Sequence, residues 1–248
     1  TASEETGPPP GDAFQTDDDG FFVDPDETER DPWWKVRFRK GPGNAYHVGR
    51  DGLLAVGSVA LEPGGDRVAI VGLHQDGQRD LFLITPRGGK HHDLRRLTTD
   101  VAAERDVAWG PDGLVFSSDA SPDGRYQLFT LDPNDPDAVP QRLTTDDRDH
   151  LSPAVLADGT VVYSSYDEHD RSELFATAGP GTTVRLTDLA VGAFEPAPGP
   201  DGGLWTLIQH HGRLRPTLMK SEAQRTLPGE AAPAAQGPPI RLPTRPVS

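Results

Sequence analysis

Three short sequence markers recur along this chain in one common register, and this repetition limits the possible folds more than any other feature. Arg-Leu-Thr occurs at 96–98, 142–144 and 185–187, which places successive copies 46 and 43 residues apart. Leu-Phe recurs at 81–82, 128–129 and 174–175, and an Asp-Gly turn signal recurs at 112–113, 158–159 and 201–202. Because the three markers keep nearly the same phase, they predict a chain of repeated structural units.

Each unit contains four short runs that are rich in Val, Leu, Phe, Tyr and Thr, the residues that favour strands. In the second unit these runs are Asp106–Trp109, Leu114–Ser118, Tyr126–Leu131 and Gln141–Thr144. No segment keeps a 3.6-residue apolar period, so we expect little helix. Four short strands in a unit of about 45 residues are typical of a β-propeller blade. The sequence thus predicts an all-β fold, a β-propeller of four-stranded blades. The alternative is a long β-sandwich with similar hairpins, which has no reason to keep three markers in phase.

The units predict four blades and part of a fifth. The blades cover Ser58–Thr98, Asp106–Thr144, Ser152–Thr187 and Phe194 to Arg225-Thr226-Leu227. Ahead of them, alternating apolar residues at Trp34–Phe38 predict a strand, and Ala45–Val48 and Leu53–Val56 predict two more strands of the partial blade. An open ring would leave sheet edges unpaired. Either a terminal strand completes the fifth blade, or the propeller is incomplete and continues outside this chain.

The two ends differ in composition from the middle. Residues 1–32 form an acidic, proline-rich lead-in that we expect to be disordered, and residues 229–248 form a Pro/Ala-rich linker or tail. The propeller is therefore expected over 33–228. Because the chain opens at Thr1 and its only methionine is Met219, we expect it to be part of a larger polypeptide or complex.

Composition excludes several partners and chemistries. With 24 Lys and Arg against 39 Asp and Glu, the net charge is −15, so we expect no nucleic-acid partner. There is no cysteine, which removes disulfides, thiolate metal sites and a cysteine nucleophile. The longest apolar runs are far too short for a membrane span in this chain.

The run Trp109-Gly110-Pro111-Asp112-Gly113, continued by Leu114 to Asp119, closely resembles the core of the TolB-type, WD40-like propeller repeat. Leu128-Phe129 and Arg142-Leu143-Thr144 stand where that family has its third and fourth strands. The resemblance covers Ser58 to Thr187 well and extends less well to Met219; Ala157 and Gly203-Leu204-Trp205 depart from the pattern. It implies a bacterial periplasmic or cell-envelope setting and a binding role. Related propellers also accompany the catalytic domains of serine peptidases.

No catalytic motif accompanies the repeats. The chain lacks a G-x-S-x-G elbow, an H-E-x-x-H pair, a phosphate-binding loop and a dinucleotide fingerprint, so we expect no enzymatic activity. A calcium loop centred on Gly20 would have Gln15 as its first ligand, which is a poor one. We therefore interpret the acidic stretch as a solvated tether and expect no cofactor and no metal, with calcium as the weaker alternative. The pairs His91-His92 and His210-His211 are interpreted as surface turns.

The propeller arrangement predicts an acidic loop face. The loops between strands two and three, and those between strand four and the next blade, emerge at the same end of antiparallel blades. Many acids lie on these loops, Glu104 and Asp123 among them. The candidate binding residues are Asp119, Asp146, Asp147, Asp149, His150, Tyr166, Asp167 and Glu168. Such a rim would steer a cationic partner towards it, with Tyr166 as an aromatic anchor. The plainer interpretation is that acidic loops keep the protein soluble.

Three functions remain at this stage. The first is a non-enzymatic binding or scaffold domain of the cell envelope that presents its acidic face to a basic protein or peptide. The alternative is a propeller that gates substrate entry to a larger serine peptidase. The third, a carbohydrate-active enzyme, needs two facing carboxylates on innermost strands. Those strands are mostly apolar, and the exception, Glu195, is interpreted as a turn residue.

Overall fold

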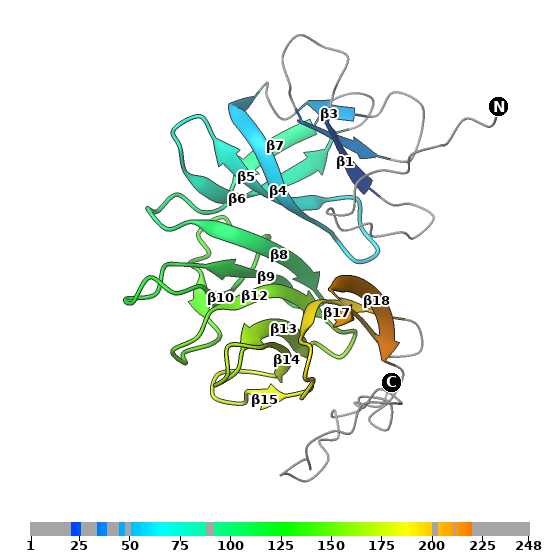
Figure 1. Ribbon diagram of the computed structural model, residues 1–248. Coiled ribbons are helices and arrows are strands. Elements are labelled where there is room, and N and C mark those ends of the chain that lie inside the picture. The colour runs from blue at the N-terminus through cyan, green and yellow to red at the C-terminus, as the bar shows by residue number, and fades with distance from the viewer. Residues whose placement is uncertain are drawn as a thin grey trace, which may run out of the picture.

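The structure is a computed structural model that describes residues 21–25, 34–38, 45–47, 51–87, 92–199, 203–210 and 212–219. Within these residues it is built of antiparallel β-sheets and has no α-helix, as the sequence predicts (Figure 1). Five sheets follow one another along the chain, and each is a simple meander in which neighbouring strands are consecutive in sequence.

Three sheets have the four strands expected of a propeller blade. The first is β4 (Leu53–Leu61), β5 (Val68–His74), β6 (Arg79–Pro86) and β7 (His92–Arg96). The second is β8 (Glu104–Gly110), β9 (Gly113–Ser118), β10 (Gln127–Leu131) and β11 (Gln141–Arg142). The third is β12 (His150–Val155), β13 (Val161–Tyr166), β14 (Ser172–Thr177) and β15 (Val184–Arg185). We call these sheets blades 1, 2 and 3.

Two three-stranded sheets flank them. The N-terminal sheet contains β1 (Phe21–Pro25), β2 (Trp34–Phe38) and β3 (Ala45–His47). Blade 4 contains β16 (Ala193–Pro198), β17 (Leu204–His210) and β18 (Arg213–Met219). Among the described residues, the N-terminal sheet and blade 4 are not hydrogen-bonded to each other, so the described strands form an open series of blades.

The first strands of successive blades lie next to one another. β4 contacts β8, β8 contacts β12, and β12 contacts β16. Side chains on these strands also bond directly between blades: the Val107 N–H donates to Ser58 Oγ at 3.1 Å, and the Ser152 N–H donates to Asp106 Oδ2 at 2.9 Å. The contacts between blades are most numerous at these first strands, which places them at the centre, with the later strands of each blade further out. This confirms the predicted β-propeller arrangement over the two face-packed sheets of a sandwich.

The recurring Thr and Leu of Arg-Leu-Thr are explained by one hydrogen-bond arrangement that appears in all three blades. The hydroxyl of Thr98, Thr144 or Thr187 accepts from the N–H of the Leu in Leu-Phe at 2.9, 2.9 and 2.8 Å. The Leu of Arg-Leu-Thr returns a backbone N–H to the carbonyl of that same leucine at 2.7 Å in each blade. The two markers keep their phase because they hold the fourth strand against the third where the ladder ends.

Turn glycines fix the start of the second strand in blades 2 and 3. Gly113 has φ 126° and Gly159 has φ 84°, both in the left-handed region that side chains disfavour. A Cβ on Gly113 would lie 2.7 Å from the carbonyl oxygen of Leu131. Glycine is therefore required there by space as well as by backbone conformation.

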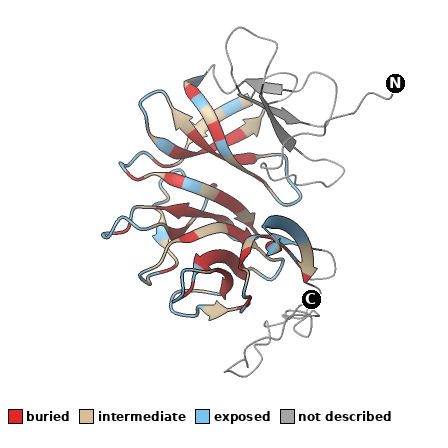
Figure 2. Cartoon of the chain, in the orientation of Figure 1, coloured by how far each residue is buried: buried red, intermediate tan, exposed pale blue. Residues whose placement is uncertain are grey.

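Buried residues are concentrated on the strands of the blades (Figure 2), and the apolar ones form clusters that join neighbouring blades. Blades 1 and 2 share a cluster that includes Val71, Leu81 and Phe116. Blades 2 and 3 share one that includes Leu128 and Tyr163, and blades 3 and 4 share one around Leu174 and Ile208. Each of blades 1 to 4 therefore buries apolar side chains against a neighbouring blade, which stabilises the series by roughly 25 cal/mol per Å² of apolar surface removed from water.

Two strand assignments differ from the sequence prediction. Leu53–Val56 is the beginning of β4, the first strand of blade 1, and not part of the preceding partial blade. The strand is long because two register shifts, at Leu53/Ala55 and Val56/Ser58, let it continue past a bulge. The structure also has a strand, Phe21–Pro25, inside the lead-in that was predicted to be disordered; its backbone pairs with β2.

Some predicted features lie outside the described residues. These are the rest of the lead-in with its calcium-loop candidate, the tail at 229–248, His91, His211, and the strand expected at Arg225-Thr226-Leu227.

Candidate functional site

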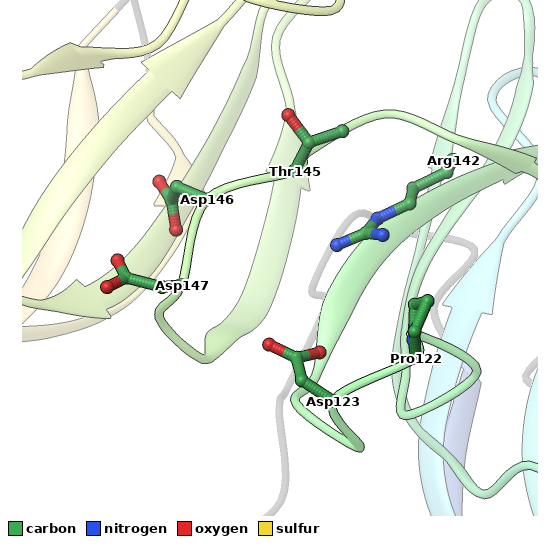
Figure 3. A pocket seen from close by; sticks show the side chains of 6 residues that line it. All are labelled: Pro122, Asp123, Arg142, Thr145, Asp146 and Asp147. Atoms are coloured by element: carbon green, nitrogen blue, oxygen red, sulfur yellow. The ribbon is translucent and has the colours of Figure 1, made fainter.

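The β9–β10 loop and the β11–β12 loop of blade 2 meet at one end of the sheet, as the predicted loop face requires. They border a pocket of about 260 Å³ that is open to solvent (Figure 3). Its lining is Pro122, Asp123, Arg142, Thr145, Asp146 and Asp147. Of the predicted binding residues, the structure thus places Asp146 and Asp147 in the pocket. Sequence analysis also placed Asp123 on this rim but did not single it out as a binding residue, and it missed Arg142.

Asp146 is the best-fixed acid of the pocket. Its Oδ1 lies 2.8 Å from His150 Nε2 and accepts the Arg148 N–H at 3.1 Å. Burial raises the pKa of Asp146, but the hydrogen bond to His150 and the nearby positive charge outweigh it, and the pKa is lowered overall. Asp146 is therefore a carboxylate at neutral pH.

Asp123 and Asp147 lie on either side of the opening (Figure 3). The Ser121 hydroxyl donates to Asp123 Oδ1 at 2.7 Å and lowers the pKa of that carboxyl. Asp147 is exposed. With Arg142 as the single cation, the pocket lining carries three acids and one base, so its surface is acidic.

His150 does not line the pocket but is buried behind it, where it bonds to the pocket residue Asp146. The side chain is 1 % exposed, and its ring packs on Tyr163 with the centroids 4.6 Å apart. Its Nδ1 has no hydrogen-bond partner among the described residues. The predicted contact role of His150 is thus replaced by one of positioning Asp146.

Two other predicted binding residues bond to the protein's own backbone. Asp119 Oδ1 accepts the Ala103 N–H at 2.7 Å, and Asp149 Oδ1 accepts the Tyr126 N–H at 2.9 Å. Each carboxylate ties one segment of the chain to another, so one of its oxygens is already occupied by a backbone N–H. They shape the rim more than they present charge from it.

Asp167 belongs to a buried ion-pair network. It accepts from the Arg171 guanidinium at 2.7 Å and from Arg185 Nη2 at 3.1 Å. Burial raises the pKa of Asp167, but hydrogen bonds from the Arg171 backbone and side chain and from the His169 N–H lower it to about 2. Its neighbours Tyr166 and Glu168 are exposed, so they are accessible to a partner. Asp167, Glu168 and His169 are close enough to bind one ion, but the two arginines already neutralise Asp167.

Three carboxylates lie on the innermost strands, which sequence analysis described as mostly apolar, and two of them, Asp106 and Glu195, influence each other. Asp106 is in β8, and Glu195 is in β16 at a bulge with φ 48°. The interpretation of Glu195 as a turn residue is therefore wrong; the bulge, not a turn, produces its unusual backbone. Burial and the charge of Asp106 raise the pKa of Glu195, while Arg105 lowers it less. The three side chains are electrostatically coupled across blades 2 and 4.

A further acid, Glu104, is buried at the beginning of β8. Burial, followed by the charges of Asp100 and Asp80, raises the pKa of Glu104 to about 8. Its Oε1 accepts from the Ser118 hydroxyl at 3.4 Å, and Oε2 has no partner among the described residues. Sequence analysis counted Glu104 with the exposed rim, which the structure contradicts, because the residue belongs to a strand and not to the loop.

Comparison with known proteins identifies the fold. No family model and no curated protein matches the chain. Among solved structures, TolB from Acinetobacter baumannii is similar over 82% of this chain, with a TM-score of 0.52 and 15% identity. A puromycin hydrolase is similar over 74%, with a TM-score of 0.55 and 14% identity. A prolyl endopeptidase, one of two in a mechanistic study, is similar over 81%, with a TM-score of 0.53 and 16% identity. The fold of this chain is a β-propeller.

The chain covers only part of each of these proteins. It spans 53% of TolB, 32% of the puromycin hydrolase and 33% of the prolyl endopeptidase. At these identities the likeness concerns the fold, and the finer assignment to the TolB-type repeat is not established by it. In the described part of the chain, no helix has the length and apolar character needed to cross a bilayer.

Proposed function

We propose that this propeller is a non-enzymatic binding domain that holds a basic protein or peptide at the acidic loop face of blades 2 and 3. The observation that carries the proposal is the pocket between the β9–β10 and β11–β12 loops, whose lining contains Asp123, Asp146 and Asp147. Their pKa values support it, since those of Asp123 and Asp146 are lowered and both stay charged at neutral pH. Three carboxylates around one opening attract lysine or arginine side chains and steer a cationic partner.

The exposed residues next to the pocket extend the proposed face. Tyr166 is 44% exposed at the end of β13, and its carbonyl accepts from Arg148 Nη1 at 3.2 Å. Arg148 also pairs with Asp146 at 3.7 Å, so one side chain links the backbone of Tyr166 to an acid of the pocket. A tyrosine beside a charged rim offers a partner apolar contact area at low entropic cost.

Titration of the whole chain with a labelled, end-blocked oligolysine tests the proposal. Binding should weaken steeply between about 50 and about 500 mM salt, because exposed charges are screened over a few ångströms at high ionic strength. The double variant Asp123→Asn/Asp147→Asn should lose most of the affinity. The matched control Asp112→Asn/Asp135→Asn removes the same charge from loops at the other end of blade 2 and should keep it. Equal affinity at both salt concentrations, or equal loss in the two double variants, would refute a specific acidic face.

The wider setting is part of the same proposal. We place the domain in the bacterial cell envelope, within a larger polypeptide or complex, on the resemblance of its repeats and on its likeness to TolB. The alternative is a propeller that gates substrate entry to a serine peptidase. It is suggested by the similarity of this chain to parts of a puromycin hydrolase and a prolyl endopeptidase. A hydrolase domain in the same polypeptide, together with peptidase activity that changes when the pocket acids are neutralised, would favour gating over scaffolding.

A further inference from the structure

The arginine of Arg-Leu-Thr has a different environment in blade 2 from that in blades 1 and 3. In blade 1, Arg96 pairs with the buried Asp80 and, at 2.9 Å, with Asp76. In blade 3, Arg185 pairs with the buried Glu173 at 3.1 Å and with Asp188 at 2.9 Å. Both guanidinium groups are therefore neutralised within their own blade.

Arg142 has no such partner in blade 2. Its Nε donates to the Thr144 carbonyl at 2.7 Å, as Arg185 does to Thr187, but no carboxylate lies within ion-pair distance among the described residues. The reason is in the sequence: the residue before Leu-Phe is Asp80 in blade 1 and Glu173 in blade 3, but Gln127 in blade 2. The neutral amide replaces the acid that would have paired with Arg142.

The pocket occupies the place of this missing pair. Gln127 turns its amide nitrogen away, to the carbonyls of Asp146 at 3.1 Å and Arg148 at 2.7 Å, and leaves its Oε1 without a partner among the described residues. The Arg142 guanidinium points into the space between the two loops (Figure 3). A guanidinium in a pocket presents paired N–H donors that match a carboxylate in a bidentate geometry.

We infer that Arg142 binds a carboxylate of the ligand, and that the ligand carries this carboxylate between positive charges. Asp123, Asp146 and Asp147 around the opening would repel an isolated anion, so the carboxylate must arrive with ammonium or guanidinium groups that face these acids. The ligand is then a basic peptide segment with one embedded acid, supplied either by an Asp or Glu side chain or by a C-terminal carboxylate. This inference rests on the proposed function, since it specifies the ligand of the same face.

General attraction to the acidic rim predicts the opposite preference. A blocked lysine-rich pentapeptide with glutamine at its centre is more positive than the same peptide with glutamate, so charge alone favours the glutamine peptide. A carboxylate held by Arg142 instead favours the glutamate peptide, by about tenfold, because hydrogen bonds between charged groups are the stronger ones. The sign of the difference thus separates the two explanations.

The experiment measures binding of both pentapeptides to the whole chain by calorimetry. Arg142→Gln should abolish the preference for glutamate, and Arg142→Lys should keep only part of it. The control Arg87→Gln removes the same charge from an exposed arginine between β6 and β7 and should leave the preference intact. Gln127→Glu should also abolish it by giving Arg142 an internal partner; if that variant does not fold, the arginine variants still decide the question.

A second pair of peptides identifies the source of the carboxylate. Lysine pentapeptides with a free or an amidated C-terminus differ only at the terminal carboxylate. If only the free C-terminus raises the affinity over the amidated one, Arg142 binds a chain terminus. If only the central glutamate raises the affinity over glutamine, Arg142 binds an acidic side chain. Equal binding of all peptides, unchanged in Arg142→Gln, would overturn the inference and leave the proposed function standing. If no peptide binds at all, the proposed function fails and the inference falls with it.

Discussion

Replacing Glu104 by glutamine should stabilise the protein in alkaline solution and have little effect in acid. Glu104 is 1% exposed at the beginning of β8, and its carboxyl group has no positively charged partner among the described residues; the Ser118 hydroxyl donates to it at 3.4 Å. Burial, with the charges of Asp100 and Asp80, raises the pKa of Glu104 from 4.5 to about 8. Glutamine has almost the same shape and carries no charge, so it removes the cost of a buried carboxylate.

The size of the effect follows from the two pKa values. The folded protein binds this proton more tightly than the unfolded chain, so its stability falls as the pH rises from about 4.5 to about 8 and is level above that. A difference of roughly three to four pH units corresponds to about 5 kcal/mol at most, at about 1.4 kcal/mol per unit. The variant should therefore gain up to about 5 kcal/mol at pH 9 and nearly nothing at pH 4.

Urea unfolding of both proteins across this pH range measures the difference directly. Glu173→Gln is the matched control, because Glu173 is buried as well but accepts from Arg185 at 3.1 Å and from the Leu189 N–H at 2.8 Å. Burial also raises the pKa of Glu173, but the glutamine variant takes a charged acceptor away from Arg185 and the Leu189 N–H, so it should gain less stability at pH 9 than Glu104→Gln does. A gain for Glu104→Gln that does not depend on pH, or a loss at pH 9, would refute the assignment of Glu104 as an uncompensated buried acid.

Three further changes test other parts of the structure. Thr144→Val leaves the Leu128 N–H without its acceptor and should cost about 1–3 kcal/mol in urea unfolding; a neutral result would show that the Arg-Leu-Thr hydroxyl does not hold the fourth strand. Asp167→Asn should lower the free energy of unfolding by about 2 kcal/mol at pH 7, because the lowered pKa of Asp167 contributes stability while the carboxyl is ionised. This difference should disappear as the pH falls towards 2, and a loss that stays constant with pH would contradict the ion-pair account. Gly113→Ala should lower the melting temperature far more than Gly124→Ala, since a Cβ at 113 meets the Leu131 carbonyl while one at 124 meets nothing within 4 Å; equal shifts would remove the steric argument.

The fold could be predicted from the sequence because each repeated marker has a local structural task. Thr144 must accept from Leu128, and Gly113 must turn where a side chain does not fit, so these residues recur wherever a blade recurs. The long first strand of blade 1 could not be predicted, because its bulge at Val56/Ser58 interrupts the alternation that marks a strand. The strand at Phe21–Pro25 was missed because the acidic, proline-rich residues around it dominated the composition.

The candidate site was predictable only in outline. The sequence places many acids on one face, but it does not show which of them bond inward, and Asp119 and Asp149 find their backbone partners 16 and 23 residues away. Alignment of the three units would have revealed Gln127 where the other blades have an acid, and with it the unpaired Arg142. That signal lies in the printed sequence, although its meaning depends on knowing that the arginine and the residue before Leu-Phe meet across the third and fourth strands.

Cross-linking between blades tests the radial arrangement most directly. Because the chain has no native cysteine, only the introduced thiols can react. The pair Asp106→Cys/Ser152→Cys joins β8 to β12, and the pair Ser164→Cys/Glu195→Cys joins blade 3 to blade 4, where the wild-type side chains accept N–H donors at 2.9 and 3.1 Å. A short thiol-specific cross-linker, followed by mass spectrometry of the digested monomer, should connect both pairs within the folded chain. Folded protein in which neither pair reacts would contradict the propeller and the shared loop face built on it.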